Sequence, residues 1–93
     1  MCLGIPGQLV EIIDLAEHRA IVDVDGVRRE INIRLVAGGA GATVEVGDWV
    51  LIHVGFAMSK IGEQEAAETL AYMRGLGDVY EQEMTDFKQE AQL

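Results

Sequence analysis

The chain has 93 residues, of which 49% are hydrophobic and 25% charged, a balance typical of one small globular domain rather than a disordered segment. Its net charge of −9 at pH 7 disfavours binding to nucleic acid and to anionic membrane surfaces. The single cysteine, Cys2, excludes an intramolecular disulfide. The first residues lack the pattern of a signal peptide, and no apolar run is as long as a membrane span, so we expect a cytoplasmic protein.

The first part of the chain is predicted to form β-strands. Residues 9–13 are apolar on much of both sides, as in a strand buried on both faces. Residues 20–25 and 27–35 alternate apolar and polar side chains. The dipeptide Asp25-Gly26 between them favours a two-residue type I′ hairpin, because both turn positions need a positive φ.

The middle of the chain combines a small-residue segment with a strongly apolar one. Residues 37–42 contain only Gly and Ala and are predicted to form a surface loop. Residues 49–58 are rich in β-branched and aromatic side chains, which indicates a central strand that a bulge or bend at Gly55 interrupts. Several short strands with turn signals between them favour a small β-barrel.

From about residue 62 the apolar period becomes helical. Ala66, Leu70 and Met73 recur at i, i+4 and i+7, and Gly75 and Gly77 are predicted to end this helix.

A second helix is expected to follow. Asp78 with Glu81 resembles a capping box, and one apolar stripe consists of Tyr80, Met84, Phe87 and Ala91. We therefore expect a barrel over residues 1–60 and a helical extension over residues 61–93, folding as one unit.

Cys2 is the residue whose chemistry points most directly to a function. A lone cysteine is most often a small buried hydrophobe, but residue 2 stands at a chain end, where a thiol is accessible. Its thiolate would be a soft ligand for low-spin iron, copper(I) or zinc. Pro6-Gly7 is typical of a turn, which could direct Cys2 toward a partner or a metal.

His53 stands out within an apolar segment. It is either a hydrogen-bonded core or edge histidine, or a ligand or proton-transfer group near Cys2. One Cys and two His cannot fill a closed zinc site of four ligands, so a metal bound here would share its ligands with a partner. Phe56 and Met58 could form an apolar contact patch, although their apolar character favours a place in the core.

Two segments resemble the signature motifs of the HypC/HupF family of NiFe-hydrogenase maturation chaperones. The first is residues 1–8, MCLGIPGQ, and the second is residues 53–58, HVGFAM. The segments 22–30 and 47–50 also fit this family, and the likeness covers about residues 1–74. Val54 stands where many relatives have threonine.

The resemblance implies an OB-like β-barrel followed by a C-terminal helix or helices, and a metallochaperone rather than an enzyme. It implies binding to the scaffold protein HypD, on which iron acquires cyanide and carbonyl ligands. It also implies delivery of the Fe(CN)2CO group to the precursor of the hydrogenase large subunit, which the chaperone holds open.

The family pattern makes Cys2 an iron ligand and a contact to both partners, with His53 assisting at the same metal site. The residues that we expect to serve partner binding are Cys2, Pro6, Gly7, Phe56 and Met58. The iron group would be held transiently, because one thiolate plus partner ligands permits ligand exchange, whereas a closed four-ligand cage would trap the metal.

Two other functions are compatible with the residues. One is a metal-free interaction module that only gates the precursor, and infrared bands of cyanide and carbonyl would separate it from an iron carrier. The other is an OB-type nucleic-acid binder, against which the net charge and the 5% aromatic content argue.

Overall fold

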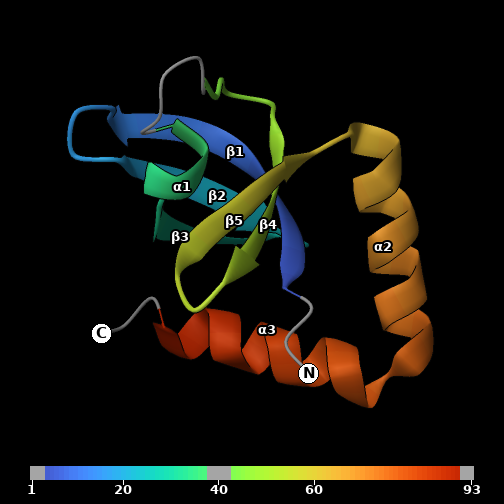
Figure 1. The fold of residues 1–93 in the computed structure, drawn as a ribbon. Helices are drawn as coiled ribbons and strands as arrows, with labels where there is room; N and C mark the ends of the chain where they lie inside the picture. The colour runs from blue at the N-terminus through green and yellow to red at the C-terminus, as the bar shows by residue number, and fades with distance from the viewer. Residues whose placement is uncertain (1–3, 38–42, 91–93) are drawn as a thin grey trace.

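The computed structural model describes residues 4–37 and 43–90. Cys2, Ala91 and most of the loop predicted at residues 37–42 therefore lie outside the described residues. The strands form a closed barrel in the order β1-β2-β3-β5-β4, which confirms the expected OB-like barrel with C-terminal helices (Figure 1). The elements are β1 (Ile5–Asp14), β2 (Arg19–Val24), β3 (Val27–Asn32), α1 (Arg34–Ala37), β4 (Trp49–His53), β5 (Phe56–Ile61), α2 (Glu63–Leu76) and α3 (Asp78–Glu90).

Strand β1 is buried over its first half only. Leu9 is fully buried, whereas Ile13 is 37% exposed, so the prediction of two buried faces fails for the second half of the strand. The pairing with β2 shifts register between Leu9 and Glu11 and again between Ile12 and Asp14. These irregularities change which side chains of β1 face the core. A prediction based on strict alternation of inward and outward residues along a strand cannot anticipate this change.

The β2–β3 hairpin confirms the predicted turn. Asp25 and Gly26 both have a positive φ, 51° and 92°. The N–H of Gly26 donates to Oδ1 of Asp23 at 3.0 Å, which supports the turn from within the hairpin. Strand β3 ends at Asn32 rather than at residue 35. The Asn32 side chain accepts the N–H of Arg34 at 2.8 Å, where α1 begins.

The predicted interruption at Gly55 is confirmed, but the prediction that residues 49–58 form one central strand is wrong. The chain reverses at Val54 and Gly55, whose φ values are 54° and 80°, and β4 pairs with β5 as an antiparallel hairpin. A left-handed φ is costly for a β-branched residue such as Val54, so Val54-Gly55 is only a weak turn signal. The turn is tied to β3, because the N–H of Asn32 donates to the carbonyl of Gly55 at 2.9 Å.

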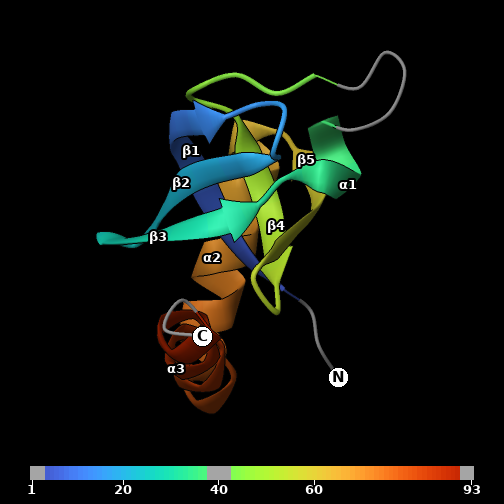
Figure 2. The ribbon, with the colours of Figure 1, turned by 90° about the vertical axis from the view of Figure 1, so that its left-hand side faces the viewer.

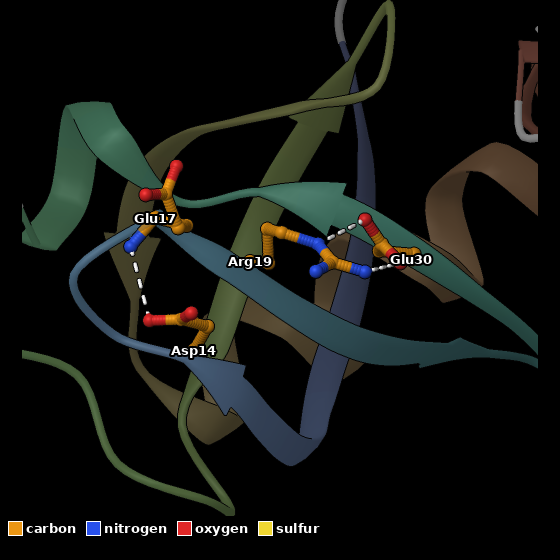
Figure 3. Close-up of polar contacts among 4 residues, drawn as sticks. All are labelled: Asp14, Glu17, Arg19 and Glu30. Carbon is orange, nitrogen blue, oxygen red and sulfur yellow. Dashed lines mark hydrogen bonds and ion pairs between the residues drawn. The ribbon is translucent and has the colours of Figure 1, made fainter.

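Side-chain ion pairs stabilise the outer surface of the β1–β2–β3 sheet. Arg19 on β2 makes a bidentate contact with Glu30 on β3, at 2.8 and 2.9 Å (Figure 3). The N–H of Glu17 donates to the carboxylate of Asp14 in the β1–β2 turn. The hydrogen bond from Arg19 lowers the pKa of Glu30 below its ordinary value, so Glu30 is charged and satisfied at neutral pH.

Helix α2 confirms the predicted helical period. Ala66, Leu70 and Met73 are all buried. Gly77, with φ 64°, ends the helix, whereas Gly75 lies inside it.

Helix α3 crosses beneath the barrel (Figures 1 and 2). Within its predicted stripe, Phe87 is 5% exposed, and Tyr80 and Met84 are partly buried against the core. The capping box is not formed as predicted, because the N–H of Glu81 donates to the carbonyl of Gly77 at 3.0 Å. No helix in the described ranges combines the length and apolar character required to cross a membrane.

Three side chains join the barrel to the two long helices. Asp25, in the β2–β3 turn, accepts a hydrogen bond from Arg74 of α2 at 2.6 Å and another from the hydroxyl of Tyr80 of α3. The Arg74 guanidinium also lies 5.9 Å from the centre of the Tyr80 ring. This Asp25 clamp fixes the α2–α3 corner against the tip of the hairpin.

Candidate functional site

The pairing of β1 with β4 brings the two sequence motifs together at one end of the barrel. Ile5 pairs with Ile52 and Pro6 with Leu51, so the start of β1 lies beside the end of β4. Gly4, with φ 78°, lies so close to this strand that a Cβ atom on it would be 3.2 Å from the carbonyl oxygen of Ile52. We call this end of the barrel, formed by Gly4 and residues 53–56, the rim. Cys2 lies outside the described residues, two positions before Gly4.

The prediction of a turn at Pro6-Gly7 is wrong, because both residues lie inside β1 and are buried. A Cβ atom on Gly7 would be 2.6 Å from Cγ2 of Val22 and 2.7 Å from Cδ1 of Ile52, so close core packing requires glycine. The pairing of β1 with β2 begins only at Gln8, so Pro6 lies in a part of β1 that does not pair with β2. Pro6 and Gly7 are both buried, so they would not touch a partner directly. Any contribution of these two residues to partner binding would come from holding β1 in place.

His53 is the last residue of β4 and is half-buried at the rim. It pairs with Phe56 across the Val54-Gly55 turn, and antiparallel partners share a face of the sheet. Both side chains therefore point to the same side of the hairpin.

A carboxylate from α3 lies within electrostatic reach of His53. Burial raises the pKa of Glu83 above its ordinary value, and positive charge on His53 acts in the opposite direction. Sequence analysis did not identify Glu83. Glu83 lies four residues before the buried Phe87 and therefore on the inward side of α3. This helical spacing is the sequence pattern from which its position could have been predicted.

Phe56 and Met58 are exposed, so a place in the core is wrong for both. They are 42% and 49% exposed, and the buried Ala57 lies between them. Sequence analysis missed two further exposed apolar residues nearby, Val54 in the turn and Leu35 on α1, which packs beside β5. We call Leu35, Val54, Phe56 and Met58 the apolar patch. The patch extends from the rim along the outer side of β5.

The described residues supply a limited set of metal ligands. Residues 4–37 and 43–90 contain no group of three or more His, Cys, Asp and Glu side chains placed to hold a metal ion. His53 supplies a donor atom at the rim, and Glu83 of α3 lies within electrostatic reach of it. A metal bound there requires further ligands from outside this set.

Residues 1–73 match the family described as the HupF/HypC family. The chain belongs to the HupF/HypC family. The "Frd operon uncharacterized protein C" of Proteus vulgaris is 56% identical over 79 residues, which cover 85% of this chain and 81% of that protein. The hydrogenase maturation factor HypC of Rhodobacter capsulatus is 53% identical over 81 residues, covering 87% and 83%. The hydrogenase maturation factor HybG of Escherichia coli (strain K12) is 46% identical over 74 residues, covering 80% and 89%.

The family match confirms the resemblance seen in the sequence and relates it to the geometry. Both HupF/HypC motifs lie within residues 1–73, and strand pairing makes them neighbours at the rim. Helix α3 begins at Asp78 and lies beyond the matched region. Glu83, which lies within electrostatic reach of His53, is therefore a contribution of this chain's own C-terminal helix.

Proposed function

We propose that the chain is a hydrogenase maturation chaperone that acts with HypD to carry the Fe(CN)2CO group. In this proposal it delivers the group to the precursor of the NiFe-hydrogenase large subunit in the cytoplasm and keeps the precursor open. The observation that carries the proposal is the β1–β4 pairing, which sets Ile5 opposite Ile52 and so brings the first motif beside the residue that precedes His53. Family membership and relatives named as hydrogenase maturation factors support it.

In this mechanism, the Cys2 thiolate binds the iron. Two residues of chain span at most about 7 Å, so the position of Cys2 two residues before Gly4 tethers the thiol to the neighbourhood of the rim. A free thiol has a pKa of about 8.5, so the charge of the iron must favour deprotonation near neutral pH. A single thiolate leaves the remaining coordination positions to partner ligands, which allows transfer by ligand exchange.

His53 assists at the same site as a second donor, or as the base that accepts the proton which the Cys2 thiol loses when it binds the iron. The Glu83 carboxyl lies within electrostatic reach of the imidazole, so its negative charge would favour a protonated or metal-bound His53.

The apolar patch supplies the contact surface for a partner. Burial of exposed apolar area contributes roughly 25 cal/mol per Å², and Phe56 and Met58 are large side chains already free of the core. Their position next to the rim lets one partner cover the patch and reach Cys2 together.

The test compares the native chain with Cys2→Ala in anaerobic pull-downs of HypD and the large-subunit precursor. The captured material is analysed for iron and for infrared bands of cyanide and carbonyl. We expect Cys2→Ala to fold normally but to lose both complexes and the bands, while the control Tyr72→Ala, on exposed α2 surface, retains them.

Three results would contradict the proposal. Retention of complexes and bands by Cys2→Ala would show that another group binds the iron. A native chain without iron or bands that still supports maturation would identify a gate that carries no metal. Loss of folding in Cys2→Ala would identify a buried structural cysteine.

A further inference from the structure

Strand β3 has an edge that no other described strand occupies. On one side it pairs with β2 over its whole length, but on the other side it meets β5 only at Asn32 and Phe56. Figure 2 shows β2 on one side of β3, with α3 lying beyond the other. We call the side of residues 27–31 that faces away from β2 the β3 edge.

The hairpin register identifies the backbone groups at this edge. Val24 and Val27 flank the two-residue turn, and such a pair is hydrogen-bonded, so alternate residues of β3 bond to β2. The N–H and C=O groups of Arg28 and Glu30 therefore point outward. The bond from the N–H of Asn32 to Gly55 confirms this alternation. Both Arg28 and Glu30 are exposed, so the four backbone groups are accessible to an added strand.

Arg29 adds an unsatisfied cation beside this edge. It pairs with the buried Val22 and so shares the core-facing side of the sheet. Its Nε atom is buried and has no hydrogen-bond partner. None of the described side chains forms an ion pair with Arg29, whereas Arg19 and Arg28 are both paired. A buried guanidinium nitrogen without an acceptor is costly, and a carboxylate would satisfy it.

The space beside the edge is open. A groove of about 490 Å³ separates the start of β3 from α3, and its lining includes Val27, Met84 and Lys88. Two acidic side chains, Asp25 and Glu81, also line it. Asp25 is paired with Arg74, and Glu81 and Lys88 on α3 offset each other, which leaves Arg29 on β3 as the cation that attracts negative charge.

We propose that the β3 edge binds an extended acidic segment of a partner protein by strand addition. The segment would place a Glu or Asp opposite Arg29 and apolar residues two positions away on each side, opposite Val27 and Ile31. Because β3 ends at the rim through the Asn32–Gly55 bond, the bound segment would lead toward His53. This inference rests on the proposed function only for the identity of the partner as a maturation protein.

A second copy of the chain fits this edge poorly. The outward groups belong to alternate residues, so a two-fold antiparallel pairing must be centred on a residue of β3. Centring on residue 28 or 30 places Arg28 or Glu30 opposite its own copy, and centring on residue 29 places the two Arg29 side chains opposite each other. The last register also sets Arg28 opposite Glu30 of the copy, but both of these side chains already form ion pairs within their own chain. Like charges directly opposite each other are destabilising. The charge pattern therefore favours a different, acidic chain.

The experiment uses the full chain and the capped synthetic peptide Thr-Val-Thr-Glu-Thr-Val-Thr, with the same peptide carrying Gln in place of Glu as comparison. Affinity is measured by calorimetry, and amide exchange by NMR locates the site. We expect the Glu peptide to bind roughly tenfold more tightly than the Gln peptide and to slow exchange at Arg28 and Glu30.

Matched variants separate the backbone contribution from the charge contribution. Arg29→Gln should abolish the preference for Glu, whereas Arg28→Gln, on the opposite face, should keep it. Glu30→Pro removes one outward N–H without affecting the β2 ladder and should weaken both peptides, in contrast to Glu30→Gln.

Equal affinity for both peptides, or exchange protection elsewhere, would overturn the proposal. Concentration-dependent protection of Arg28 and Glu30 without peptide would show a second copy at the edge and would also overturn it. The β3 edge does not involve the Cys2 thiol, so Cys2→Ala protein should bind the Glu peptide as the native chain does. A failure of the proposed iron transfer can thereby be distinguished from a failure of peptide binding.

Discussion

Gly4 and Ile52 are in backbone contact, with 3.2 Å between the Cβ position of Gly4 and the carbonyl oxygen of Ile52. Gly4 also has a φ of 78°, a backbone conformation that residues other than glycine rarely adopt. This contact holds Gly4 and the start of β1 against the end of β4, and it requires glycine.

Gly4→Ala should therefore destabilise the chain by roughly 1–2 kcal/mol and weaken partner capture beyond the loss of folded protein. Urea unfolding and pull-downs at matched concentrations of folded protein measure the two effects. Gly75→Ala is the control, since its Cβ would meet nothing within 4 Å and lies in α2, where alanine stabilises by about 0.5–1 kcal/mol. Full partner capture by Gly4→Ala would show that this contact does not position the terminus.

Asp25→Asn should loosen the α2–α3 corner. The variant loses the charge that pairs with Arg74, and since both side chains are substantially exposed, we expect a loss of about 1 kcal/mol at low salt. The loss should shrink in 1 M salt, a screening effect that unfolding at two ionic strengths measures. Glu45→Gln makes the same charge change at an exposed site and should have little effect. An equal loss in both variants would indicate a net-charge effect instead of a clamp.

Tyr80 should ionise above the ordinary range. Burial raises the pKa of Tyr80 above its usual value of about 10, and its hydrogen bond to Asp25 acts in the same direction. The folded state thus binds this proton more tightly than the unfolded chain does. The corresponding stability is present below pH 10 and is lost as the pH rises through the folded pKa. Ultraviolet titration of Tyr72→Phe protein isolates Tyr80, and a midpoint at or below 10 would contradict the hydrogen bond from Tyr80 to Asp25.

Phe56→Ser with Met58→Ser should impair partner binding more than stability. Both side chains are more than 40% exposed, so we expect the free energy of unfolding to change by less than about 1 kcal/mol. Complex formation with HypD or the precursor should fall at least tenfold, because the apolar patch loses its two largest members. Tyr72→Ser, at a 66% exposed site on α2, serves as the control. If the double variant unfolds, Phe56 and Met58 are part of the hydrophobic core and not of a contact surface.

His53→Ala should lower hydrogenase maturation with a loss of stability under about 1 kcal/mol, since the imidazole is half-buried at the rim. Glu83→Gln should reproduce part of this effect if the carboxylate favours a protonated or metal-bound His53. Hydrogenase activity in a complemented strain and thermal unfolding of each variant measure the two quantities. If maturation is normal with Glu83→Gln, the Glu83 carboxylate does not assist His53, and Glu83 contributes only to the folding of α3.

Local chemistry was sufficient to predict several elements. Asp25-Gly26 tolerates two positive φ values, so the hairpin could be placed to the residue. Ala66, Leu70 and Met73 repeat with the helical period, and their burial in α2 followed that pattern. The prediction failed at Val54-Gly55, because only the hydrogen bond from Asn32 to Gly55 and the pairing of β4 with β5 reveal that the apolar run folds back on itself.

The amino-acid sequence by itself determined the family, the barrel and the presence of two long helices, because turn residues, apolar periods and two short motifs are local properties of the chain. Only the tertiary structure decided that Gly4 lies beside Ile52, that Phe56 and Met58 face outward, and that Glu83 approaches His53. Those relationships depend on strand order, on register shifts and on where α3 docks. Each is a balance of packing between segments that are distant in sequence, so no local pattern records it.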